Sequence, residues 1–211
     1  RWLHLFSCEV REALHVPHKQ SKLVDLRMFH CTVSSSAIVP VQLPHLATFA
    51  YDNPDPEPTP WQSPFAPLHL LDIIPALGLQ LRALLLPGEL VDELASTFAR
   101  LPALALLYLT SLGLLPIAAL AALPHKLHRL HLGPSTLVPE AFAISRSPPR
   151  VAIVVQARDT DACRWDAAAN TAKSVGIEWI DDECVDPEDL ALLHEGFEVS
   201  VQAVRRETAA W

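Results

Sequence analysis

A repeated leucine pattern most constrains what this chain of 211 residues can fold into. The pattern is L-x-x-L-x-L, and one copy continues into the Cys of the longer form L-x-x-L-x-L-x-x-N/C. The second leucines of successive copies are 23, 20, 22, 16, 20 and 26 residues apart, a spacing typical of a repeat architecture. The copies are Leu3–Cys8 (the tail of one), Leu23–Cys31, Leu43–Leu46, Phe65–Leu70, Leu81–Leu86, Leu101–Leu106 and Leu127–Leu132.

The pattern has a simple physical basis. A short strand turns alternate leucines inward, and the earlier leucine comes in from the preceding bend. Because no copy can bury its own leucines, the copies are expected to stack and share one core. We therefore predict an α/β fold: an irregular solenoid with a parallel sheet on its concave face and helices or turns outside. Arg1 falls inside a copy, so we expect the natural start of the protein to lie upstream.

Proline and charge divide the chain into two parts. Residues 1–149 hold 18 of the 19 prolines and have a net charge of −1, whereas residues 150–211 have a net charge of −7. We interpret 1–149 as the irregular repeats and 150–211 as acidic α/β repeats or a cap. Residues 52–67 contain six prolines and are predicted to form a solvated loop, with a proline-rich ligand for a partner as the alternative.

The acidic part shows a β-α-β order with short connections, which predicts parallel strands. It ends in a run of alternating apolar and polar residues, typical of a strand with one wet face that could cap the sheet. A separate domain is the alternative to a continuation of the repeats. The predicted elements are strands at 151–156, 177–180 and 197–202, and helices at 161–174 and from Asp186 to a stop at Gly196.

The copies identified above resemble those of the leucine-rich repeat family. Their irregular, Pro-rich and Cys-punctuated form is similar to the degenerate repeats of fungal F-box-type proteins, over residues 1 to about 135. In that family an N-terminal F-box recruits a ubiquitin-ligase scaffold, and the repeats select the substrate. The resemblance thus implies the substrate-recognition part of such a subunit. No segment here matches the F-box, so the scaffold is an expected partner only if that box lies upstream.

Motifs for catalysis or cofactor binding are absent from the sequence. The six glycines form no G-x-G-x-x-G, P-loop or G-x-S-x-G motif. His125, His128 and His131 would share a side of a helix, but the predicted strand turns the last two to opposite faces. The four scattered cysteines favour a reducing, intracellular location, cytoplasmic or nuclear. We expect a non-catalytic protein with no catalytic residue, cofactor or metal site.

A protein is the expected partner. The negative net charge and the lack of a Lys/Arg block argue against nucleic acid and anionic membranes. Aromatic and Arg side chains between the inward leucines would project from the concave face and anchor a protein. The alternative is that the proline loop covers part of this face. The candidate partner-binding residues are His4, Phe6, Arg27, Phe29, His69, Leu71, Leu85, Ala105, Leu107 and His131.

Two further hypotheses belong to other functional classes. Residues 150–202 could form a small α/β enzyme or cofactor-binding domain, because their β-α-β order suits one. Residues 101–123 contain no charge and are long enough to cross a bilayer, which would make the protein membrane-anchored. Pro102, Gly113 and Pro116 interrupt that stretch and favour a buried strand and helix instead.

Overall fold

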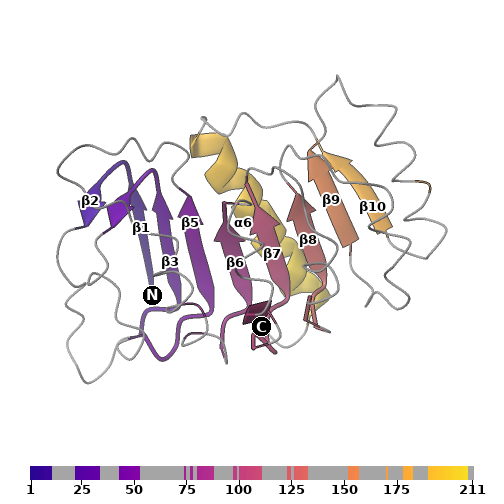
Figure 1. Ribbon diagram of the computed structural model, residues 1–211, viewed down its shortest axis with the longest axis horizontal. Coiled ribbons are helices and arrows are strands. Elements are labelled where there is room, and N and C mark those ends of the chain that lie inside the picture. The colour runs from indigo at the N-terminus through magenta and orange to yellow at the C-terminus, as the bar shows by residue number, and fades with distance from the viewer. Residues whose placement is uncertain are drawn as a thin grey trace.

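A parallel β-sheet of eight strands forms the body of the protein (Figure 1). The strands lie side by side in the order in which they occur along the chain, and each neighbouring pair is parallel. With the C-terminal helix described below, this is an α/β architecture with a parallel sheet, as predicted. The strands are β1 (Trp2–Phe6), β3 (Asp25–Phe29), β5 (Thr48–Asp52), β6 (Ala83–Leu86), β7 (Leu106–Leu109), β8 (Arg129–Leu132), β9 (Ala152–Gln156) and β10 (Glu178–Asp182).

Two smaller features complete the fold. Helix α6 (Leu190–Glu207) crosses one face of the sheet, and β2 (Glu9–Val10) pairs with β4 (Thr32–Val33) beside its first edge. The computed structural model describes residues 1–10, 22–33, 43–52, 74, 77, 80–87, 97–98, 100–110, 123–124, 126–132, 152–156, 170, 178–182 and 190–208.

Strand pairing gives the repeat a more regular spacing than the leucine pattern does. Equivalent positions of paired strands are 23 residues apart in five of the seven steps. The step from β5 to β6 is 35 residues, and the 12 additional residues fall in the segment that contains the proline-rich stretch 52–67. The equivalent positions are Leu3, Leu26, Phe49, Leu84, Leu107, Leu130, Ile153 and Trp179.

The predicted register is wrong in two copies. Leu107, not Leu104, pairs with Leu84, and Phe49, not Leu46, pairs with Leu26. Leucines are so dense after residue 100 that the pattern fits two registers three residues apart. Backbone hydrogen bonds distinguish them, because the N–H of Ala105 donates to the carbonyl of Arg82 at 2.8 Å in the bend before the strand.

The same bend precedes each of the central strands. The N–H of Ala47 donates to the carbonyl of Val24, that of Arg82 to Ala47, and that of His128 to Ala105, each at 2.8 Å. One residue before each donor, a leucine turns into the interior. These leucines are Leu46, Leu81, Leu104 and Leu127, all at most 1% exposed. Each such side chain contributes about 1.5–3 kcal/mol when fully buried.

The acidic C-terminal part agrees with the sequence predictions for its first two strands and for the helical residues 190–196, but not for the residues that follow. β9 and β10 lie close to the predicted strands 151–156 and 177–180, and they are parallel. The predicted strand at 197–202 is wrong, because these residues belong to α6, which passes through Gly196 without a break. Apolar residues at 197, 199 and 201 fit a strand, but burial selects Leu193, Phe197, Val201 and Val204, which share one side of a helix.

Part of the possible membrane span forms a strand of the sheet. Residues 106–109 of the uncharged stretch 101–123 form β7, in the middle of the sheet. Within the described ranges, no helix is both long and apolar enough to cross a membrane. Residues 53–67 of the predicted loop, the copy at Phe65–Leu70, His125 and most of the predicted helix at 161–174 lie outside the described residues.

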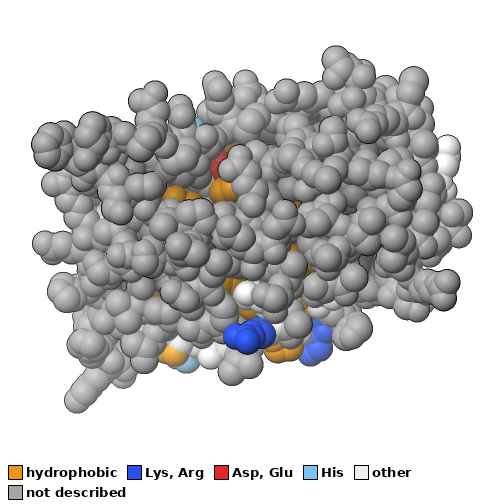
Figure 2. Space-filling view, in the orientation of Figure 1, with side chains coloured by type: hydrophobic (Ala, Val, Ile, Leu, Met, Phe, Trp, Pro, Cys, Tyr) orange, Lys and Arg blue, Asp and Glu red, His pale blue; other side chains and the backbone are white. Residues whose placement is uncertain are grey.

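Surface charge is visible at one edge. Figure 2 shows Lys and Arg side chains along the edge of the molecule where the strands of the sheet begin. Apolar side chains of the described residues are visible in small areas of the same view.

Candidate functional site

The face of the sheet that α6 covers is the candidate site, and we call it the helix-facing surface. Side chains alternate between the two faces of each strand, so one row of paired residues points toward α6. This row is His4, Arg27, Ala50, Leu85, Tyr108 and His131. The sheet therefore presents a basic and imidazole end at β1 and β3, an apolar middle, and a second imidazole at β8.

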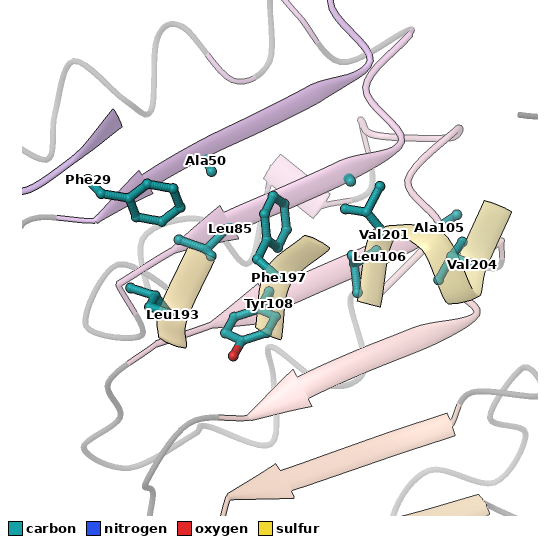
Figure 3. Packing of buried hydrophobic residues seen from close by; sticks show 11 residues of the cluster. Phe29, Ala50, Leu85, Ala105, Leu106, Tyr108, Leu193, Phe197, Val201 and Val204 are labelled. Atoms are coloured by element: carbon teal, nitrogen blue, oxygen red, sulfur yellow. The ribbon is translucent and has the colours of Figure 1, made fainter. Parts of the chain in front are cut away.

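The apolar middle packs directly against the helix (Figure 3). Four side chains of α6, at helix positions i, i+4, i+8 and i+11, are at most 3% exposed. They form one cluster with residues from β3, β5, β6 and β7. The cluster is Phe29, Ala50, Ala83, Leu85, Ala105, Leu106 and Tyr108 from the sheet side, and Leu193, Phe197, Val201 and Val204 from α6.

Phe197 lies at the centre of the contact. Its ring meets the ring of Tyr108 edge to face, with centroids 5.7 Å apart, and the guanidinium carbon of Arg27 lies 5.1 Å from its centroid. The residue before it is a glycine for a packing reason. A Cβ on Gly196 would lie 3.3 Å from Oη of Tyr108, so the missing side chain lets α6 approach β7 closely. The sequence prediction of a helix stop at Gly196 missed this role.

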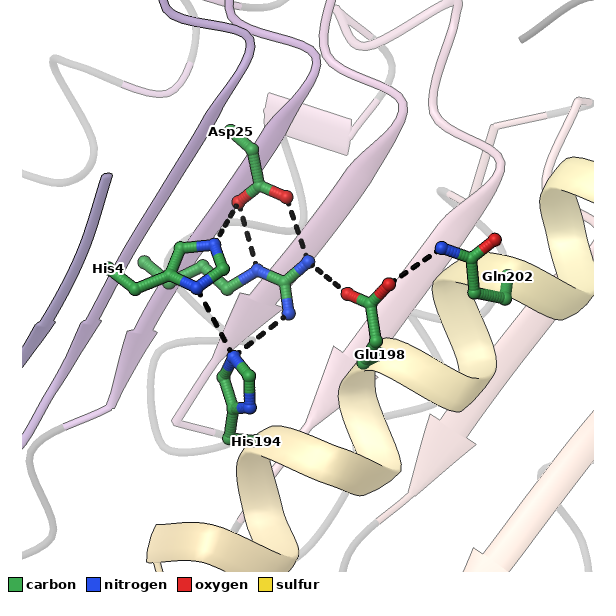
Figure 4. Close-up of polar contacts among 6 residues, drawn as sticks. His4, Asp25, His194, Glu198 and Gln202 are labelled. Atoms are coloured by element: carbon green, nitrogen blue, oxygen red, sulfur yellow. Dashed lines mark hydrogen bonds and ion pairs between the residues drawn. The ribbon is translucent and has the colours of Figure 1, made fainter. Parts of the chain in front are cut away.

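A polar group, which we call the Arg27 cluster, lies at the β1 and β3 end of the helix (Figure 4). Arg27 is 1% exposed and donates from Nε to Oδ1 of Asp25 at 2.9 Å and from Nη2 to Oδ2 at 2.8 Å. This bidentate pairing fixes the plane of the guanidinium. The cluster is His4, Asp25, Arg27, His194, Glu198 and Gln202.

The helix supplies the other half of the Arg27 cluster. Nη2 of Arg27 also donates to Oε2 of Glu198, whose second oxygen accepts from Nε2 of Gln202 at 2.7 Å. Nε2 of His194 lies 3.4 Å from Nη1 of Arg27 and 3.4 Å from Nδ1 of His4. A buried cation is thus shared between a carboxylate of the sheet and a carboxylate of the helix.

The pKa values follow from this arrangement. Burial, assisted by the positive charge of Arg27, lowers the pKa of His4 and of His194, so both rings are neutral at pH 7. Burial alone would raise the pKa of Glu198, but the hydrogen bonds from Gln202 and Arg27 outweigh it and lower the pKa. Burial alone would lower the pKa of Arg27, yet its two carboxylate partners raise it. The ion pair therefore persists at neutral pH.

The opposite end of the helix-facing surface contains a second imidazole. His131 stacks on Tyr108 with ring centroids 3.8 Å apart and an angle of 13° between the planes. Neither of its ring nitrogens has a hydrogen-bond partner among the described residues. Burial, and secondarily the charge of Arg129, lowers its pKa to about 3. Beside it, Arg129 donates to Oε1 of Glu207 at 2.9 Å and anchors the last turn of α6.

The structure places most of the predicted partner-binding residues beneath α6. His4 and Arg27 belong to the Arg27 cluster, and Phe29, Leu85 and Ala105 belong to the apolar cluster. Phe6 is 43% exposed and stacks on Phe29 with centroids 5.7 Å apart. His131 contacts Tyr108. His69 and Leu71 lie outside the described residues.

Leu107 is the one described candidate on the wrong face. It pairs with Leu84 and Leu130 on the side of the sheet opposite α6, and it is 0% exposed. Sequence reasoning missed Tyr108 in its place, together with Asp25, His194 and Glu198. The signal for Tyr108 was present, because a strict 23-residue step from Leu85 reaches it. The helical spacing from Leu193 to Val204 was the signal for the covering helix.

The chemistry of the helix-facing surface is that of packing and ion pairing. Within the described residues, no group of three or more His, Cys, Asp and Glu side chains is arranged to hold a metal ion. Comparison with protein-family models, with curated proteins and with solved structures finds no significant match to this chain.

Proposed function

We propose that the chain is a non-catalytic protein-binding module of the leucine-rich repeat type, whose helix-facing surface recognises an amphipathic helix. The repeat type is supported by the 23-residue step between paired strands, by the bend that recurs before them and by the buried leucine in each bend. In an open array of stacked repeats, the strand face is the surface that usually holds a partner.

One observation carries the proposal: the surface already holds an amphipathic helix. α6 places four apolar side chains on the sheet and pairs Glu198 with the buried Arg27. Helix-in-groove recognition uses this combination of apolar anchors at one helical face and a charged group that sets the register. A surface that binds its own helix in this way has the shape and charge to bind a similar helix from another protein.

The occupant defines the partner that the surface would accept. The helix of such a partner would carry apolar residues at positions i, i+4, i+8 and i+11 and a carboxylate at i+5. In α6 these positions run from Leu193 to Val204, and the carboxylate is that of Glu198. The 18 residues of α6 correspond to about 27 Å of helix. A basic residue at the position of Glu198 would be rejected, because it would leave Arg27 facing a second cation in a buried site.

A partner helix must compete with α6. As a segment of the same chain, α6 has an effective concentration of about 1 mM or more, so a partner succeeds only if it binds more tightly or if α6 opens spontaneously. The proposal therefore requires that α6 leave the sheet without unfolding it. This requirement distinguishes a binding face from an ordinary core.

Hydrogen exchange on the full chain tests that requirement. We expect the amides of α6 to exchange at least about tenfold faster than those of β6 and β7, because helix opening leaves the parallel ladder intact. Mass spectrometry of peptic fragments gives the two rates. Equal protection of α6 and the central strands would mean that the helix opens only when the sheet unfolds, and would refute the proposal.

Direct binding provides a second test. A labelled synthetic peptide of residues 190–207 should bind the Phe197→Ala chain, whose own helix is weakened, at least about tenfold more tightly than the wild-type chain. Fluorescence anisotropy measures both affinities, and circular dichroism confirms that the variant keeps its fold. The matched control peptide carries Glu198→Arg and should bind poorly. If the two peptides bind equally, recognition through Arg27 is wrong.

The Glu198→Ala chain is the milder alternative to the Phe197→Ala chain. It keeps the apolar side chains of α6 and loses one of the two carboxylate partners of Arg27, so it serves if the larger deletion unfolds the protein. The narrower role that the family resemblance implies, substrate recognition in an F-box-type ubiquitin-ligase subunit, stays a prediction. Co-purification of the full-length protein with a ubiquitin-ligase scaffold tests it.

A small enzyme domain at 150–202 has less support. β9 continues the sheet from β8 rather than starting a new one, and α6 packs over β7 instead of over β9 and β10. A self-contained domain would place its helix on its own strands.

A further inference from the structure

Two thiols face each other at equivalent positions of the first two copies of the repeat. The Sγ atoms of Cys8 and Cys31 are 3.4 Å apart, and neither is in a disulfide. Cys31 is fully buried, whereas Cys8 is half-buried. The pair lies between the pairing of Phe6 with Phe29 and the pairing of Glu9 with Thr32. These belong to two separate sheets with the same 23-residue offset, and Cys8 and Cys31 have this offset too.

The same backbone bend positions both thiols. Ser7 and His30, each just before its cysteine, have positive φ values of 47° and 51°. The N–H of Ser7 donates to the carbonyl of Phe29 at 3.0 Å, which holds the two bends against each other. Neighbouring strands lie about 4.8 Å apart, and this separation falls within the Cα spacing of disulfides. The two sulfur atoms need to approach by little more than about 1.3 Å to reach bonding distance.

We propose that Cys8 and Cys31 form a redox-active pair that an external disulfide such as oxidised glutathione converts into an intramolecular disulfide. The two thiols lose two electrons and two protons, and the external disulfide is reduced to two thiols. The bond formed is Sγ–Sγ between the first two copies of the repeat. This modification site is independent of the proposed recognition of a helix.

The two cysteines take different parts in the exchange. Burial foremost, together with the neighbouring thiol group of Cys8, raises the pKa of Cys31 to about 11, and its Sγ donates to the carbonyl of Phe29 at 3.3 Å. Cys31 is therefore a protonated, shielded thiol at pH 7. Cys8 is the more accessible sulfur, so its thiolate attacks the external disulfide and expels one thiolate.

The second step closes the bond. Cys31 gives its proton to solvent and attacks Sγ of Cys8 in the mixed disulfide, which expels the second thiolate. Because Cys31 must be deprotonated, this closing step should accelerate as the pH rises toward 9. The product links the edge strand β1 covalently to β3. β1 carries His4 and Phe6, whose ring centroids lie 5.2 and 5.5 Å from that of His194 in α6.

Mass mapping of the full wild-type chain tests the proposal. After incubation with oxidised glutathione at pH 8, tryptic digestion without reductant should yield peptide 2–11 joined to peptide 28–82, and thiol treatment should separate them. The Cys163→Ser/Cys184→Ser chain should form the same link, which shows that no other cysteine is needed. The oxidised chain should melt several degrees higher than the reduced chain.

The Cys31→Ser chain is the matched control. It should stop at a glutathione adduct on Cys8 and show no increase in melting temperature, because the resolving thiol is gone. Two results would overturn the proposal: a stable glutathione adduct on Cys8 of the wild-type chain with Cys31 still reduced, or no reaction at either cysteine while the chain stays folded.

Discussion

Protonation of His131 should make the fold sensitive to acid, and this sensitivity can be removed by one substitution. His131 is 1% exposed, stacks on Tyr108 and has a pKa of about 3. In the unfolded chain an imidazole has a pKa of about 6.5. Between these two values the unfolded state binds a proton that the folded state does not, so the free energy of unfolding falls as the pH falls.

The magnitude follows from the gap between the two pKa values. Each pH unit within the window is worth about 1.4 kcal/mol, so His131 lowers the free energy of unfolding by about 3 kcal/mol at pH 4 and by about 4 kcal/mol at pH 3. Its cost at pH 7 is close to zero. His131→Leu keeps an apolar side chain of similar size against Tyr108 and removes the titrating group. When the pH falls from 7 to 4, the free energy of unfolding of the variant should therefore rise by about 3 kcal/mol relative to that of the wild type.

Urea denaturation at the two pH values, followed by circular dichroism, measures this gain. His4 and His194 also have lowered pKa values, so the variant should still lose some stability in acid. Leu85→Ala is the matched control, because it removes a buried side chain of the same cluster but no titrating group. Its loss of free energy of unfolding relative to wild type should therefore be the same at both pH values. A difference between His131→Leu and wild type that does not change with pH would refute the reasoning.

Three further substitutions test other contacts. Phe197→Ala removes the centre of the apolar cluster and should lower the free energy of unfolding by about 3–5 kcal/mol in urea denaturation; a loss under about 1 kcal/mol contradicts the packing. Burial raises the pKa of Asp52, which accepts from Thr110 at 2.6 Å. Asp52→Asn should therefore stabilise the chain at pH 7 but not at pH 3, where the carboxyl is protonated in both states; equal melting-temperature gains would exclude this cause. Glu207→Gln breaks the partly exposed pair with Arg129 and should cost less than about 1 kcal/mol in the same titration; a larger loss contradicts that assignment.

The parallel sheet could be predicted from the sequence because the signal is local and repeated. Leucines such as Leu26, Leu84 and Leu130 occur at the same place in their copies, and all three are buried in strands of the same sheet. The register of β7 could not be predicted by the leucine pattern, since leucines in that copy satisfy two alignments. Backbone hydrogen bonding to β6 removes the ambiguity, and it places Tyr108 instead of Leu107 on the helix-facing surface.

The candidate surface was predicted in part. His4, Arg27, Phe29, Leu85 and His131 were identified from alternation along each strand, which depends on nothing beyond the strand itself. Their burial could not be foreseen, because it depends on a segment more than fifty residues further along the chain than the last of them.

The sequence by itself determined that this chain stacks strands and buries leucines, because each copy has the same apolar spacing and cannot satisfy it alone. The tertiary structure decided what residues 197–202 become and what lies on the strand face. Their apolar residues fit a strand and a helix equally well in isolation. The helix is selected because only that form places Val204 on the same side as Phe197 and Val201. The same form also extends Glu198 to Arg27.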